Sequence, residues 1–158
     1  MDILAVTQTN RYEESAVGDM TRMMFLLFNY DDMGLAIRSR ETLKLEMCNQ
    51  VTRANPNICV QTLNGSKKVV VQEDKSYRIG ETLDSVTVYA QLAAEMVAAF
   101  QENVRLLKMK GLQHDWEEQD MLGIVMMGTC PTFFRMNMTT TLSDSVKYGH
   151  YPEQETIL

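Results

Sequence analysis

The chain has 158 residues, of which 45% are hydrophobic, and a formal net charge of −6 at pH 7. This length suits one domain that can bury a core without disulfides, and the negative charge argues against a strong, non-specific nucleic-acid binder, which needs a basic surface to displace counterions. The three cysteines lack the spacing of a disulfide framework or a zinc site, and no segment resembles a membrane span or a secretory signal. We therefore expect a single intracellular domain, residues 1–158, in the cytoplasm or nucleus.

Apolar residues in the first part of the chain recur at helical spacing and then at strand spacing. Between Tyr12 and about Tyr30 they mark one side of a predicted amphipathic helix. Beyond a break at residues 31–34, four short apolar runs bounded by turn residues predict strands: Leu35 to Arg38, Leu43 to Met47, Ile58 to Thr62 and Val69 to Glu73. The dipeptide Asn64-Gly65 is typical of a tight turn, so the last two strands should form a hairpin.

The second part of the chain starts with a long helical pattern. Asp84 or Ser85 can cap a helix that continues to about Lys108. Two further strands are predicted at 121–129 and 132–138, then a short helix from Thr139 to Lys147, and the last three residues resemble the start of another strand. This order of elements predicts an α/β fold with a mixed central sheet flanked by helices.

The charge is unevenly distributed along the sequence. Residues 34–80 hold eight Lys/Arg against four acids, a local balance of +4, so the remainder is strongly acidic. This stretch includes Lys67, Lys68 and Arg78, which we take as candidate contacts to a phosphate-bearing substrate. Scattered surface lysines would give the same balance.

One pair of residues could carry chemistry at the end of a predicted strand. Side chains alternate along a strand, so Glu73 and Lys75 should share a face with Val69 and Val71. A carboxylate there can hold a divalent cation, and the lysine can position water or stabilise charge on a phosphate. A surface ion pair at a strand end explains the same triplet.

The surrounding sequence is similar to a known family. Pro56-Asn57 lies sixteen positions before Glu73, at the start of the partner strand, in the stretch PNICVQTLNGSKKVVVQEDK. This layout resembles the PD-(D/E)XK, or restriction-endonuclease-like, superfamily: a leading helix, an antiparallel hairpin carrying Asp and then Glu-x-Lys, a following helix and a further strand. Fungal proteins with such a core are also similar in the segments QEDK, AQLAAEMVAAFQ, MGTCPTFFRM and YPEQETIL. The resemblance covers nearly the whole chain and implies a metal-dependent nuclease acting on DNA.

The resemblance also implies a site for Mg²⁺ or Mn²⁺. Its metal ligands would be Asn57, Glu73, the carbonyl of Asp74 and a leading-helix acid such as Glu14, and Lys75 would assist attack by water. Asn57 stands where the family has Asp, so an oxygen ligand is kept but a negative charge is lost.

On the long helix, Gln91 and Glu95 are four residues apart and so lie on one face beside the apolar stripe. From there Gln91 could reach the site or a phosphate. A half-buried polar border explains both residues equally well.

Three functional hypotheses therefore stay open. The first is a metal-dependent endonuclease, and the second is a catalytically inactive nuclease-fold module that binds nucleic acid or protein. The third is a structural domain in which the Glu-Asp-Lys match is accidental. A homodimer is compatible with all three.

The hairpin register gives a geometric prediction. A two-residue turn would place Asn57 opposite Gln72, whereas a three-residue loop at 64–66 would pair Leu63 with Lys67 and place Asn57 opposite Glu73. The shared metal site requires the second arrangement, so we predict the three-residue loop or a compensating bulge.

Overall fold

The computed structural model describes residues 14–31, 34–73, 85–112, 117–127, 129–153 and 156–157, with the backbone alone at 14–15, 70–73 and 85. These residues form helices and strands in the following order: α2 (Glu14–Leu27), β1 (Leu35–Ser39), β2 (Leu43–Met47), β3 (Gln50–Ala54), β4 (Ile58–Thr62), β5 (Lys67–Glu73), α3 (Ser85–Met109), β6 (Glu118–Met127), β7 (Cys130–Thr139) and α4 (Thr140–Tyr148). None of the described helices is long and apolar enough to cross a membrane.

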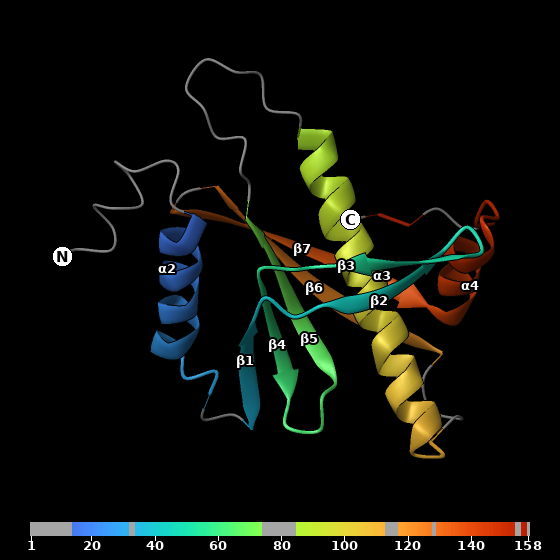
Figure 1. The fold of residues 1–158 in the computed structure, drawn as a ribbon, viewed down its shortest axis with the longest axis horizontal. Helices are drawn as coiled ribbons and strands as arrows, with labels where there is room; N and C mark the ends of the chain where they lie inside the picture. The colour runs from blue at the N-terminus through green and yellow to red at the C-terminus, as the bar shows by residue number, and fades with distance from the viewer. Residues whose placement is uncertain are drawn as a thin grey trace.

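The central sheet has five strands in the order β1-β4-β5-β6-β7 (Figure 1). All neighbours are antiparallel except β5 and β6, which run parallel. A parallel pair needs a crossover connection, and α3 lies between β5 and β6 in the sequence. The predicted α/β class, with a mixed sheet and flanking helices, is confirmed.

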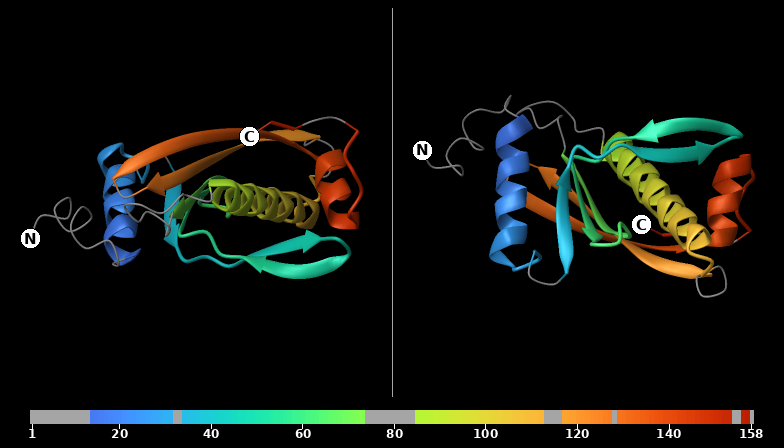
Figure 2. Two further views of the ribbon diagram at one scale, coloured as in Figure 1. Left: turned by 90° about the horizontal axis from the view of Figure 1, so that it is seen from above. Right: turned by 60° about the horizontal axis from the view of Figure 1, so that its bottom comes forward.

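The longest helix, α3, lies between the sheet and a separate two-stranded ribbon formed by β2 and β3 (Figure 2). Its buried residues, among them Leu92, Met96 and Phe100, share one core with Leu43 of the ribbon and Met121 of β6. A second core cluster lies under α2, where its buried side chains pack on β4, β5 and β6. The sheet therefore buries a different face under each of the two helices.

Most predicted elements are confirmed, and the differences have physical causes. β3 was not predicted because four of its five residues are exposed and it pairs only with β2, so its sequence carries no apolar alternation. The start of β6 lies in a polar, acidic stretch that was expected to precede the strand. Residues 156–157, expected to begin a strand, are not in one.

The β4–β5 hairpin is present, but its loop differs from the predicted one. The Thr62 amide donates to the Ser66 carbonyl at 2.8 Å and the Gly65 amide donates to the Thr62 carbonyl at 2.9 Å. The loop is therefore the three residues 63–65, one position earlier than predicted. Gly65 has a φ of 91°, a left-handed conformation that glycine adopts without steric cost.

A bulge follows this loop. Gln61 pairs with Lys67 but Val60 pairs with Val69, so Lys68 is the extra residue on β5. The bulge shifts the register by one residue from the one that the loop alone would set. Beyond it the last pair is Ile58 with Val71.

Candidate functional site

The candidate site lies at the end of the β4–β5 hairpin that is opposite its turn. Asn57 directly precedes β4 and Glu73 ends β5, so both lie at the same edge of adjacent strands. Because Ile58 pairs with Val71, continuing the register aligns Asn57 with Gln72. The predicted alignment of Asn57 with Glu73 is therefore wrong, since the bulge at Lys68 cancels the effect of the three-residue loop.

Several residues implied by the family resemblance cannot be placed. Asp74, Lys75 and Arg78 lie outside the described residues. Glu14 is the first residue of α2, and the description there covers the backbone alone.

The expected substrate contacts lie in different surroundings. Lys68 is the half-buried bulge residue of β5. Gln91 is exposed on α3, and its side-chain amide donates to Glu95 Oε1 at 3.3 Å.

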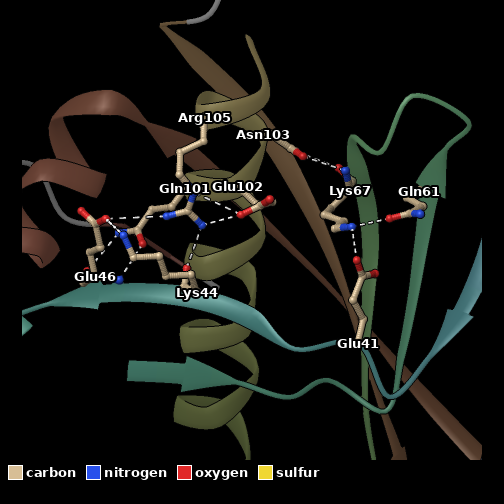
Figure 3. A network of polar contacts seen from close by, with 9 residues as sticks. All are labelled: Glu41, Lys44, Glu46, Gln61, Lys67, Gln101, Glu102, Asn103 and Arg105. Atoms are coloured by element: carbon tan, nitrogen blue, oxygen red, sulfur yellow. Dashed lines mark hydrogen bonds and ion pairs between the residues drawn. The ribbon is translucent and has the colours of Figure 1, made fainter. Parts of the chain in front are cut away.

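Lys67 is not a surface cation. Its side chain is only 5% exposed, and its ammonium group lies 2.5 Å from Glu41 Oε1 and also donates to the side-chain carbonyl of Gln61 (Figure 3). This ion pair offsets the cost of burying the charge. Lys67 is therefore removed from the candidate phosphate contacts, and it stabilises the junction between β4, β5 and the β1–β2 connection.

Asn103 of α3 holds the bulge in place. Its side-chain carbonyl accepts from the Lys67 amide at 2.6 Å, and its side-chain amide donates to the Lys67 carbonyl at 2.9 Å and to Gln119 Oε1 at 3.0 Å. The side chain thus satisfies both backbone groups of Lys67 next to the irregular part of the ladder. This contact spans 36 residues of sequence, so the turn sequence could not reveal the register it supports.

Glu95 is the most unusual ionisable residue in the described structure. It is 1% exposed, and its Oε2 atom is buried without a hydrogen-bond partner among the described residues. Burial raises the pKa of this carboxyl to about 8, although the hydrogen bond from Gln91 acts in the opposite direction. Glu95 is therefore largely protonated at neutral pH.

The part of α3 that includes Glu95 packs on the central sheet at β6. A Cβ added to Gly123 would lie 2.9 Å from Leu92 Cδ2 and from Met96 Sδ, so this part of α3 packs directly on β6 at Gly123. Gly123 pairs with Val70, which pairs with Cys59.

The same row of residues is linked to Glu95 electrostatically. Burial, with smaller contributions from the charges on Glu41 and Glu95, raises the pKa of the Cys59 thiol to about 12, while Lys67 acts in the opposite direction. The charge of Glu95 therefore acts on the thiol of Cys59.

The donors at this edge are oxygen atoms, which suit hard cations such as Mg²⁺ and Mn²⁺. Among the residues that the structure describes, no group of three His, Cys, Asp or Glu side chains could hold a metal ion. The side chains of Glu14, Glu73 and Asp74, which the resemblance adds as metal ligands, lie outside the described side chains.

Sequence reasoning took Glu95 as a half-buried border residue and did not identify Glu41, Gln61 or Asn103. One signal was present for Glu95, because it is the charged residue within the otherwise apolar run AAEMVAAF of a helix. The other three become meaningful only when distant elements are brought together.

Comparisons with known proteins add no assignment. No family model matches the chain, and no curated protein or solved structure shows significant similarity to it.

Proposed function

We propose that this chain is a metal-dependent nuclease with a restriction-endonuclease-like core, which hydrolyses phosphodiester bonds at the edge of the sheet formed by the start of β4 and the end of β5. The observation that carries the proposal is the path of the chain. A leading helix precedes an antiparallel strand pair, and a long helix then leads to a strand parallel to the second member of that pair. This path matches the layout implied by the PD-(D/E)XK resemblance, with Asn57 and Glu73 at the expected strand ends.

The ligand atoms of the proposed site are oxygens, which suit a hard divalent cation. Asn57 would supply an amide oxygen and Glu73 a carboxylate, joined by the Asp74 carbonyl and Glu14, although the observed register aligns Asn57 with Gln72 and not with Glu73, as the shared site was expected to require. When bound, Mg²⁺ or Mn²⁺ would polarise the phosphodiester and lower the pKa of bound water. In this proposal Lys75 assists the attack of water and stabilises charge on the phosphate.

A second candidate function is a nuclease-fold module that binds nucleic acid or protein without cleaving it. The register favours it, because Asn57 is aligned with Gln72 rather than Glu73. Asn57 also lacks the charge that recruits a cation. The two candidates share a fold and differ only in catalysis.

Cleavage assays separate the two candidates. The parent chain and Asn57→Asp, Glu73→Ala and Glu118→Ala variants are incubated with single-stranded DNA, double-stranded DNA and RNA, in Mg²⁺, in Mn²⁺ or in EDTA. The nuclease proposal predicts that Asn57→Asp raises cleavage and that Glu73→Ala abolishes it. Glu118, an exposed acid at the start of β6, is the matched control and should have no effect.

Two results would contradict the nuclease proposal. Equal cleavage in all variants would point to contamination or another site. No cleavage even with Asn57→Asp would favour the binding module, for which a salt titration is the next measurement. Binding that depends on Lys68, Lys75 and Arg78 should weaken as salt rises, because phosphate contacts release counterions.

A further inference from the structure

The β1–β4 pair and the β2–β3 ribbon form one long, bent hairpin. The residue numbers of paired residues have the same sum throughout both ladders, for example in the pair of Leu43 with Ala54. The connections between the two ladders keep this register, because the Arg40 amide donates to the Asn57 carbonyl at 2.9 Å. Asn57 therefore lies in the bend where the hairpin leaves the central sheet and continues into the ribbon on α3 (Figure 1).

Arg40 stands opposite Asn57 in a backbone conformation that arginine rarely adopts. Its φ is 55°, in the left-handed region where a Cβ atom is crowded by the backbone. The Arg40 side chain is exposed, and within the described residues its guanidinium has no hydrogen-bond or ion-pair partner. Backbone strain is concentrated at functional sites in proteins, so a strained residue with an unpaired cation beside Asn57 points to a ligand.

Arg53 is a second exposed cation near this bend. It lies directly opposite Lys44 in the ribbon, and like charges in such pairs repel each other. The Lys44 ammonium is neutralised by Glu46 Oε1 at 2.6 Å, and Lys147 already contacts the other oxygen of that carboxylate at 2.9 Å. The part of the chain that the structure describes provides no carboxylate partner for Arg53. An external anion would supply the missing negative charge.

We propose that Arg40 and Arg53 bind the phosphates of DNA where its backbone passes beside Asn57. Arg53 precedes Asn57 by four residues, so their Cα atoms are at most about 14 Å apart. Phosphates follow one another every ~3.4 Å of axis along one strand, so a few nucleotides span this distance. The planar guanidinium donates two parallel hydrogen bonds to a phosphate, which suits arginine to this contact.

The charge of the whole chain supports a localised contact. At a net charge of −6 the protein repels a polyanion over most of its surface, so binding must depend on the few cations that acids do not neutralise. Lys67 is excluded because it is buried against Glu41. The inference rests on the proposed function and names described residues that would hold its nucleic-acid substrate.

The test measures the binding of fluorescein-labelled single- and double-stranded DNA by fluorescence anisotropy, in EDTA so that metal-dependent cleavage cannot occur. Arg40→Gln, Arg53→Gln and the double variant are compared with the parent. Arg22→Gln is the matched control, because Arg22 is an exposed arginine of α2 and its replacement changes the net charge equally. We expect each single variant to raise Kd at low salt by at least about fivefold, and to lower the slope of log Kd against log salt concentration by about 0.7–0.9.

Lysine variants separate a lost charge from a disturbed fold. Arg40→Lys and Arg53→Lys keep the cation and should retain most of the binding that the glutamine variants lose. Three results would overturn the inference: a parent chain that does not bind DNA at low salt, glutamine variants that bind no more weakly than Arg22→Gln, or displacement of the DNA by polyglutamate as readily as by unlabelled DNA. The last result would indicate an acidic protein partner instead.

The outcomes also distinguish this inference from the proposed function. If binding depends on Arg40 and Arg53 but Asn57→Asp does not cleave DNA in Mg²⁺ or Mn²⁺, the nuclease proposal falls, and the inference stands for a module that binds without cleaving. If Glu73→Ala abolishes a cleavage activity that the two glutamine variants keep in full, with unchanged Kd, the nuclease proposal stands and the role of these arginines is overturned.

Discussion

The buried polar side chains in the two halves of α3 differ in whether their hydrogen bonds are satisfied. In the C-terminal half, Gln101 bonds both backbone groups of Glu46, at 2.9 and 3.0 Å, and Asn103 bonds both backbone groups of Lys67. In the N-terminal half, Glu95 is as deeply buried but leaves one oxygen unpaired. The paired side chains of Gln101 and Asn103 hold α3 against the ribbon and against β5. One carboxyl oxygen of Glu95, by contrast, is buried without a hydrogen-bond partner among the described residues.

The strongest test of this contrast is to remove a paired group. Asn103→Ala would leave the buried amide and carbonyl of Lys67 without partners, and each unsatisfied group costs about 1–3 kcal/mol. We expect the free energy of unfolding to fall by roughly 4 kcal/mol in urea denaturation. Asn137→Ala is the control, since Asn137 is exposed, and should change stability by less than about 0.5 kcal/mol. Equal losses would mean that the bulge does not depend on Asn103.

The next test concerns the unpaired group and gives an effect of the opposite sign. The pKa of Glu95 is about 8 in the folded chain against its ordinary value of 4.5, so between these pH values the folded protein keeps a proton that the unfolded chain releases. Stability from this group is complete below pH 4.5 and is lost as pH rises towards 8, by about 1.4 kcal/mol per pH unit. Glu95→Gln removes this slope and should be more stable than the parent by roughly 3 kcal/mol near neutral pH.

Urea denaturation in EDTA at about pH 5.5 and about pH 7.5 measures that slope. EDTA prevents any bound divalent ion from contributing to the measured stability. Glu102→Gln should keep the parental slope, because Glu102 is partly exposed and paired with Arg105. A parent chain whose stability does not change across this range would contradict the assignment of Glu95 as a buried, protonated acid.

The elements that depend on local sequence could be predicted from the sequence, whereas the features that depend on contacts between distant elements could not. Helices α2 and α3 and the strands of the sheet were predictable because their apolar periodicity is local. The hairpin was predictable from Asn64-Gly65, but not its register, because the bulge at Lys68 is held by Asn103 of a distant helix. In the candidate site, the prediction that Asn57 and Glu73 lie at the ends of neighbouring strands is correct. The prediction that they lie opposite each other is wrong, because Asn57 is aligned with Gln72.

The next test concerns the packing of the N-terminal half of α3, which includes Glu95, on β6 at Gly123. Gly123→Ala would add a Cβ 2.9 Å from the ends of Leu92 and Met96, both fully buried. These side chains must move, and we expect a loss of about 1–2 kcal/mol in thermal or urea unfolding. Gly18→Ala is the control, since nothing lies within 4 Å of an added Cβ there. An unchanged stability in Gly123→Ala would indicate that α3 packs less tightly on β6 than described.

The smallest effect is expected at Glu46, whose carboxylate lies near the surface beside Lys44 at 2.6 Å and Lys147 at 2.9 Å. Hydrogen bonds from these lysines lower the pKa of Glu46 to about 2, so its contribution is present above pH 4.5 and is lost as pH falls towards 2. Water and salt screen such pairs, so Glu46→Gln should cost less than about 1 kcal/mol, and the cost should vanish near 1 M NaCl. The backbone bonds from Gln101 survive this change and keep the ribbon on α3. A loss above about 2 kcal/mol that persists in high salt would show that the carboxylate, and not Gln101, anchors the ribbon.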